Sequence, residues 1–155
     1  MNAKQKPAGY ILHKDEIDAQ AFRFRHPLGG DRSECVMSAL GRAAGLKRVG
    51  VNIARVPAGK EAFVYHRHHG EEEWVYILEG EARSEIDDVA ETVRAGDFIG
   101  YPAGVAHPTA PSRLTASRFC ASTANSIGNS RNTCRQKPLT IMLTASSAEI
   151  PRCRQ

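Results

Sequence analysis

The chain has 155 residues and a formal net charge of +4, and 41% of its residues are hydrophobic. This length suits one domain with its own core, and no run approaches the roughly 20 apolar residues that a membrane-spanning helix requires. The charge does not indicate a nucleic-acid-binding surface, because residues 1–107 hold 14 Lys/Arg against 16 Asp/Glu and the excess lies in the remaining C-terminal part. The composition favours a soluble single-domain protein with no nucleic-acid or membrane partner.

The cysteines indicate an intracellular protein. They are widely spaced, without a Cys-x-x-Cys pair, and are Cys35, Cys120, Cys134 and Cys153. This spacing favours free thiols over a disulfide framework and does not resemble a zinc ribbon. Because the first residues also lack the apolar run of a secretory signal, we expect a cytoplasmic location.

The first part of the chain, residues 1–47, is predicted to form an N-terminal arm followed by leading strands. Its first residues are polar and of mixed charge, whereas residues 21–26 alternate apolar with basic side chains and predict a short strand. Phe22 and Phe24 are expected to pack in the core or at a subunit contact. The pattern of residues 33–46 suits a helix but is interrupted by glycines, so the structure of this segment stays open.

The clearest strand patterns lie in the middle of the chain. Residues 48–56 alternate in the manner of a strand and end at a Pro-Ala-Gly corner. In the next predicted strand, residues 61–68, His66 and His68 share one face with apolar side chains, because successive side chains point to opposite sides. After a short turn, Glu73 shares a face with two apolar side chains. The two histidines and the glutamate are therefore expected to point into the interior.

These side chains predict a metal ion. A buried carboxylate without a partner is costly, and so are neighbouring buried histidines that would have to become charged together. One divalent cation removes both costs, and His107, which follows a Gly and Pro corner, supplies a third nitrogen ligand. Alternation places the rival His69 on the opposite face and Arg67 outward. Glu71 and Glu72 lie in the turn, where we expect them to face water.

Short strands separated by turns continue beyond this site. Residues 81–86 alternate, Asp87-Asp88 predicts a tight hairpin to residues 89–93, and glycine and proline corners bracket residues 98–101. Short strands with turns this frequent are typical of an antiparallel barrel or sandwich and not of a βαβ fold. We therefore predict an all-β fold.

Two motifs within these strands resemble those of the cupin superfamily. The first motif consists of Gly59, His66-x-His68, Glu73 and Gly80. It differs from the family pattern by one residue in its first gap. The second motif consists of Gly96, Pro102-x-Gly104 and His107. The resemblance implies a cupin-type jelly-roll β-barrel, usually dimeric, with one metal ion inside. Carried over by position, its ligands are His66, His68, Glu73 and His107.

The resemblance ends near Pro111, so we divide the rest of the chain into a barrel core, residues 48–111, and an atypical tail, residues 112–155. Pro111 stands where the second motif usually has asparagine. Residues 112–137 are rich in serine, threonine and asparagine, which makes them weak strand material. Only residues 138–145 recover a strand-like run. A reading-frame shift just beyond the last motif, or a diverged and partly disordered tail, would account for this change.

A site of three imidazoles and one carboxylate suits Zn, Fe, Mn, Ni or Co and leaves at least one open coordination position. We expect a metal-dependent enzyme acting on a small oxygen-rich metabolite, of the dioxygenase, isomerase or decarboxylase type. The alternatives are a non-catalytic metal-containing binding or sensor module, and a truncated barrel without function. Asn52, Ser84 and Tyr101 are candidates near the metal, but the sequence identifies no catalytic or substrate-binding residue. The expected partners are a small-molecule ligand and a second copy of the chain.

Overall fold

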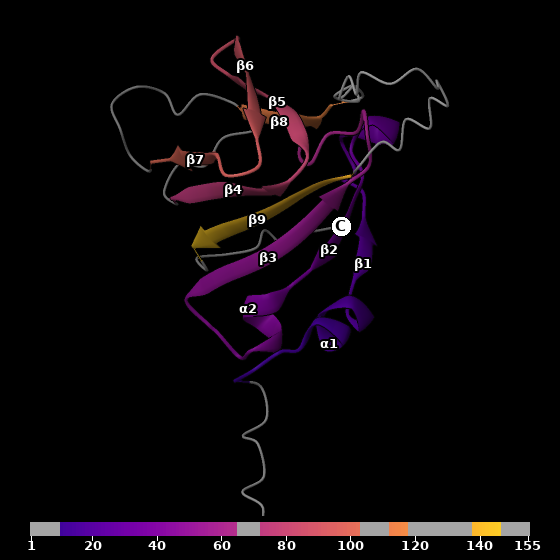
Figure 1. Ribbon diagram of the computed structural model, residues 1–155, viewed down its shortest axis with the longest axis vertical. Coiled ribbons are helices and arrows are strands. Elements are labelled where there is room, and N and C mark those ends of the chain that lie inside the picture. Colours follow the sequence, from indigo (N-terminus) through magenta and orange to yellow (C-terminus); the bar gives the residue numbers. More distant parts are fainter. Residues whose placement is uncertain (1–9, 65–71, 103–111, 118–137, 147–155) are drawn as a thin grey trace, which may run out of the picture.

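Two antiparallel sheets enclose the core of the protein. The computed structural model describes residues 10–64, 72–102, 112–117 and 138–146. Within these ranges, the larger sheet has six strands in the order β1-β2-β3-β9-β4-β7, and the smaller one has three in the order β6-β5-β8 (Figure 1). The strands are β1 (Phe22–Phe24), β2 (Cys35–Ser38), β3 (Val49–Val56), β4 (Glu73–Glu79), β5 (Glu81–Ile86), β6 (Val89–Arg94), β7 (Phe98–Tyr101), β8 (Ser112–Ala116) and β9 (Leu139–Ser146). The predicted all-β fold is therefore confirmed.

The helices of the described residues are short. They are α1 (Lys14–Ala19), the 3₁₀ helix η1 (Gly30–Arg32) and α2 (Leu40–Ala43). Residues 33–46, whose structure the sequence left open, contain both β2 and α2. Across the part of the chain that the structure describes, no helix has the length and apolar character needed to cross a membrane.

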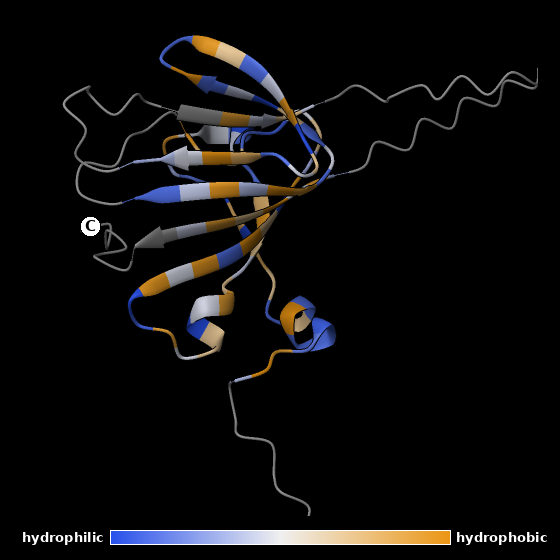
Figure 2. Ribbon diagram, turned by 60° about the vertical axis from the view of Figure 1, so that its left-hand side comes forward, coloured by the Kyte–Doolittle hydropathy of each residue, from blue (hydrophilic) through white to orange (hydrophobic). Residues whose placement is uncertain are grey.

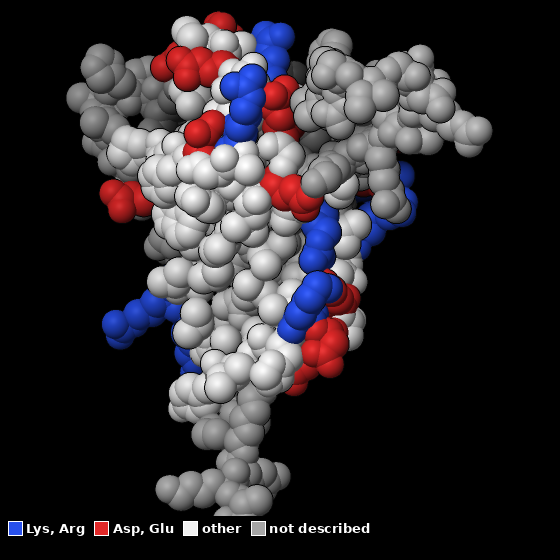
Figure 3. Space-filling view, viewed as in Figure 1, with Lys and Arg blue, Asp and Glu red and all other residues white. Residues whose placement is uncertain are grey.

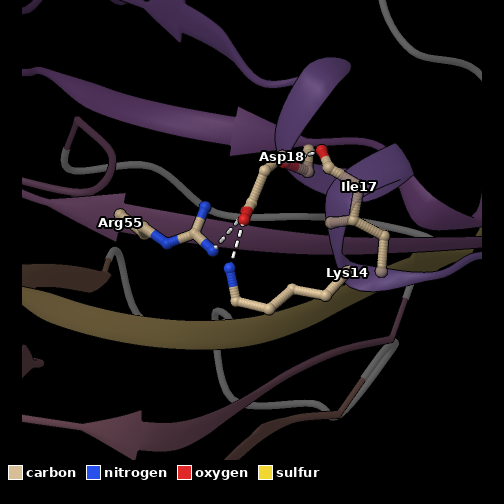
Figure 4. Close-up of polar contacts among 5 residues, drawn as sticks. Lys14, Ile17, Asp18 and Arg55 are labelled. Carbon is tan, nitrogen blue, oxygen red and sulfur yellow. Dashed lines mark hydrogen bonds and ion pairs between the residues drawn. The ribbon is translucent and has the colours of Figure 1, made fainter.

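The expected N-terminal arm contains α1, which docks on the face of the larger sheet that points away from the core. The buried Ser38 on β2 donates a hydrogen bond to the carbonyl of Ile17 at 3.2 Å. Arg55 on β3 pairs with Asp18 at 2.9 Å, and Lys14 donates a further hydrogen bond to the same carboxylate (Figure 4). The hydrogen bond from Lys14, together with Arg55, holds the pKa of Asp18 below its ordinary value. Contacts with the sheet thus hold a polar segment that the local pattern alone did not identify as a helix.

The core lies between the two sheets. Along β3 hydrophobic and hydrophilic residues alternate, and Figure 2 shows them as bands of orange and of white or blue. The fully buried members of the core come from both sheets and include Ala54, Val56, Val75, Ile77, Ala82, Leu114 and Ile141. The predicted alternation therefore holds on β4 and β5, where Val75, Ile77 and Ala82 are buried. On β3 the buried Ala54 and Val56 lie on the face opposite Val49, Val51 and Ile53.

The predicted hairpin at Asp87-Asp88 is confirmed. These two residues connect β5 to β6, and Ile86 pairs with Val89 directly beside the turn. Both aspartates have positive φ, 50° and 63°. Two positive φ angles are the signature of the type I′ turn, whose twist matches that of the flanking strands.

The C-terminal part of the chain contributes strands to both sheets. β9 lies between β3 and β4 and pairs with β3 along its whole length, from Leu139 opposite Val56 to Ser146 opposite Val49. β8 pairs with β5 in the smaller sheet. The strand-like run at residues 138–145 is therefore confirmed, and the segment judged to be weak strand material begins with a strand. The division of the chain at residue 111 stays a prediction.

One face of the molecule carries few charged groups. In the space-filling view the surface over β4, β9 and β3 is largely uncharged, and Lys, Arg, Asp and Glu gather around it (Figure 3). On β4 and β7, the exposed apolar side chains include Tyr76, Leu78 and Phe98. Trp74 packs on Phe98, with 5.8 Å between the ring centroids. Contiguous apolar surface of this kind is typical of sites where proteins associate.

Cys35 is a free thiol inside the core. Its side chain is 0% exposed, and it lies on β2 opposite Phe24. Burial, assisted by the negative charge of Glu34, raises the pKa of Cys35 from 9.0 to about 11. The expectation of free thiols is met at this residue, and the other three cysteines lie outside the described residues.

The raised pKa of Cys35 predicts a loss of stability at alkaline pH. The folded state binds the thiol proton more tightly than the unfolded state, so the contribution is complete below the unfolded pKa of 9.0 and is lost as the pH rises through about 11. We expect the free energy of unfolding, measured by urea denaturation, to fall more between about pH 8 and about pH 10.5 in the wild type than in Cys35→Ala. An equal fall in both proteins would contradict this prediction.

Candidate metal centre

Glu73 is the predicted metal ligand that the structure describes. It begins β4 and shares a face with Val75 and Ile77, which are 1% and 0% exposed. Its partners in register are Tyr101 on β7 and Ala145 on β9, so it lies between two neighbouring strands. The half-buried carboxylate is therefore on the face of the sheet that looks into the core, as strand alternation predicts.

The histidines weighed for the site, and one further glutamate, lie outside the described residues: His66, His68, His69, Glu71 and His107. Glu72 is exposed, as expected for a turn residue that faces water. Within the ranges that the structure describes, no three His, Cys, Asp or Glu side chains come together in a metal-binding arrangement. The quartet of His66, His68, Glu73 and His107 therefore stays a prediction.

The three polar candidates near the metal occupy inner faces of three different strands. Asn52 on β3 pairs with the buried Leu143 and is itself half-buried. Tyr101 ends β7, packs against the core and lies directly opposite Glu73. Ser84 on β5 is 5% exposed. Sequence alternation thus selected three residues that all face the space between the sheets.

A divalent metal ion fits the surroundings of Glu73. A carboxylate on an inner sheet face is an oxygen donor whose charge is costly to bury without a cation or hydrogen-bond donors. The neighbouring inner-face side chains of the same sheet are apolar and include Val75, Ile99 and Leu143, all buried. One carboxylate among such side chains is the environment in which a protein-bound cation is stabilised and bulk water is excluded.

The sequence did not predict a cavity beside the hairpin of β5 and β6. It has a volume of about 250 Å³ and lies between that hairpin and the beginning of β7, with Ser84 and Ile99 among its lining residues. In the sequence, one residue hinted at this cavity. Ser84 is a polar residue on the inner face of β5, the face that also carries the fully buried Ala82. A cavity depends on how distant elements pack, which strand alternation does not report.

Comparison with known sequences identifies a family for the middle of the chain. The sequence profile of the family described as Cupin domain matches residues 52–110. This range contains both motifs in full, from Gly59 to His107. No curated protein matches the chain.

Solved structures share the fold. A candidate sugar phosphate isomerase from Acidithiobacillus ferrooxidans is 25% identical, with a TM-score of 0.70 over 89% of this chain and 75% of that one. A predicted oxalate decarboxylase from Thermotoga maritima is 19% identical, with a TM-score of 0.61 over 88% and 97% of the two chains. A polyketide cyclase from Streptomyces resistomycificus is 17% identical, with a TM-score of 0.61 over 91% and 81%.

Three independent observations now agree. Both motifs lie in the range that the family profile matches, the strands form two antiparallel sheets, and a solved structure with a TM-score of 0.70 superposes on 89% of the chain. Residues 52–110 therefore match the cupin domain family, and the described strands have the cupin-type jelly-roll fold.

Proposed function

We propose that this protein is a metal-dependent enzyme acting on a small oxygen-rich metabolite. One divalent ion, which is Zn, Fe, Mn, Ni or Co, would be held by His66, His68, Glu73 and His107. The observation that carries the proposal is the position of Glu73, a half-buried carboxylate on the inner face of β4 between buried apolar side chains. A carboxylate in that place can supply an anionic oxygen ligand to a divalent cation.

When bound, the metal ion would supply Lewis-acid chemistry to a substrate oxygen. The chain's own residues would prepare the site for it. Glu73 provides an anionic ligand, and the buried Val75, Ile99 and Leu143 keep the surrounding space apolar and exclude water. Tyr101, directly across from Glu73 in the register of β4 and β7, would be the residue that orients a ligand through its phenol group.

The similar structures support a small, oxygen-rich substrate. A sugar phosphate and oxalate, which the names of two of these proteins contain, both present several oxygen atoms in a compact molecule. An isomerase, a decarboxylase and a cyclase share this fold, so the fold alone does not select a reaction. We therefore propose the substrate class and leave isomerase, decarboxylase and dioxygenase activity as the reactions to be assayed.

Metal content is the test of the proposed site. Protein purified without added metal is expected to contain about one divalent ion per chain by elemental mass spectrometry. His66→Ala and Glu73→Ala remove one ligand each and are expected to lower the metal content at least about tenfold. Glu72→Ala is the matched control, because Glu72 is exposed and directly precedes Glu73. Stoichiometric metal in both ligand variants would refute the site.

The alternative function is a non-catalytic metal-containing binding or sensor module. What favours it is the apolar character of the inner-face positions one step further along the strands from Glu73, where Val75, Ile99 and Leu143 lie buried beside one another. Assays of the metal-loaded protein with sugar phosphates, small dicarboxylic acids and catechols separate the two functions. Product formation that is lost in Glu73→Ala supports the enzyme, whereas tight ligand binding without product supports the module.

The proposal includes a homodimer in the cytoplasm. The exposed apolar side chains of Tyr76, Leu78 and Phe98 support association with a second copy, since such side chains gain stability when they leave water. Light scattering on the same purified protein reports the oligomeric state directly.

A further inference from the structure

The inner face of β3 carries a polar amide on the same sheet as the proposed metal ligand Glu73. Asn52 alternates with Ala54 and Val56, which are 0% exposed, so its side chain lies on the core side of the sheet. It is half-buried, and no described residue forms a hydrogen bond with its amide. Because the amide is neither enclosed nor paired, a molecule held between the two sheets can bind it.

The register of four strands shows on which side of Glu73 such a molecule would lie. Glu73 on β4 has Tyr101 on β7 as its partner on one side and Ala145 on β9 as its partner on the other. Gly50 on β3 continues this row beyond Ala145. Toward β3 the residue types of the row are therefore small, whereas the β7 side carries an aromatic ring. A ligand at the metal centre has more space toward β3.

The next row of the same face ends at Asn52. It consists of Ile99, Val75, Leu143 and Asn52, of which the first three are buried and apolar. Asn52 lies two strands across and two residues along from Glu73, which corresponds to roughly 12 Å between their Cα atoms at ordinary strand spacings. An extended chain advances about 3.5 Å per three bonds, so an acid of about five carbon atoms would fill what the two side chains leave of this distance.

From this placement we propose that Asn52 determines substrate specificity by binding a hydroxyl group at the far end of a linear carboxylic acid of about five carbon atoms. The amide can donate and accept hydrogen bonds, as a hydroxyl group does. The carbon chain would run past Gly50 and the buried Leu143. Because the carboxylate of the acid would lie at the metal held by Glu73, this role of Asn52 rests on the proposed function. The substrate class is thereby narrowed to hydroxy acids of this length.

Two acids that differ in one hydroxyl test this role by isothermal titration calorimetry. 5-Hydroxypentanoate is expected to bind the metal-containing protein about fivefold more tightly than pentanoate, the effect of one neutral hydrogen bond. In Asn52→Leu, which keeps the size of the side chain and removes its amide, the two acids are expected to bind equally. 2-Hydroxypentanoate, whose hydroxyl lies beside the carboxylate, is expected to bind the wild type and Asn52→Leu with the same affinity.

Thr140→Val is the matched control. Thr140 is a partly buried polar residue of the same sheet, but it lies on the opposite face from its neighbours Leu139 and Ile141, which are buried in the core. This variant is expected to keep the fivefold gain from the far hydroxyl.

Three results would overturn the role of Asn52 and leave the metal centre in place. They are equal binding of pentanoate and 5-hydroxypentanoate by the wild type, a gain that persists in Asn52→Leu, and a loss of 2-hydroxypentanoate binding in that variant. Elemental mass spectrometry of the same samples tests the metal centre itself. Protein that holds no metal would overturn the metal centre, and the role of Asn52 with it.

Discussion

Replacing Ile141 with alanine is expected to lower the free energy of unfolding by about 2–5 kcal/mol, the usual cost of removing most of a buried aliphatic side chain. Ile141 is 0% exposed and lies opposite Ala54 on β3 and Ile77 on β4. The loss combines the transfer of apolar surface to water with the cavity that remains. Urea denaturation followed by far-ultraviolet circular dichroism measures it.

Met142→Ala is the matched control in the same strand. Met142 is the next residue of β9, lies on the opposite face and is only partly buried. Its truncation is expected to cost less than half as much as that of Ile141, because less apolar surface is lost and a surface site leaves no enclosed cavity. Equal losses in the two variants would contradict the assignment of Ile141, and not of Met142, to the core face of β9.

β9 illustrates what a local pattern can and cannot predict. The alternation of Leu139, Ile141 and Leu143 identified a strand, and all three side chains are buried. The pairing of this strand between β3 and β4 could not be derived in the same way, because pairing depends on contacts between residues far apart in the sequence. A segment that seemed to follow the barrel in sequence therefore lies inside its larger sheet.

β8 and α1 show the converse case: both segments have a weak local sequence pattern, and both still form a regular element. Ser112–Ala116 has few strand-favouring residues, but Leu114 reaches the core and the backbone pairs with β5. α1 is short and polar, and contacts from Ser38 and Arg55 on the sheet hold it in place. In both elements tertiary contacts decide what intrinsic propensity leaves open.

For the candidate site, the sequence could predict what depends on one strand but not what depends on the packing of several elements. The inward direction of Glu73 follows from its spacing to Val75 and Ile77, which is a property of one strand. The cavity at Ser84 requires the hairpin and β7 to leave space between them, which is a property of packing. Sequence alternation can therefore identify a candidate metal-binding residue on a strand. It cannot predict a cavity in which another molecule would bind.

Replacing Gly80 with alanine is the second change for which we expect a large effect. Gly80 connects β4 to β5 with φ of +91°, a conformation that costs a residue with a Cβ about 1–2 kcal/mol. A Cβ at this position would also lie 3.0 Å from the Cα of Leu139 and 3.1 Å from the carbonyl oxygen of Pro138. Since these are backbone atoms leading into β9, they cannot move aside as the end of a flexible side chain would.

Gly96→Ala separates the two causes. Gly96 has a similar φ of +98°, but among the described atoms nothing lies within 4 Å of the position that its Cβ would take. Gly96→Ala is therefore expected to show the backbone cost alone, and Gly80→Ala to lose at least about 1 kcal/mol more in the free energy of unfolding, as overpacking against fixed atoms does. If urea denaturation gave the same loss for both, the contact with the start of β9 would not be tight. A larger loss at Gly80 would instead show that this motif glycine is required by the strand that completes the sheet as well as by its own turn.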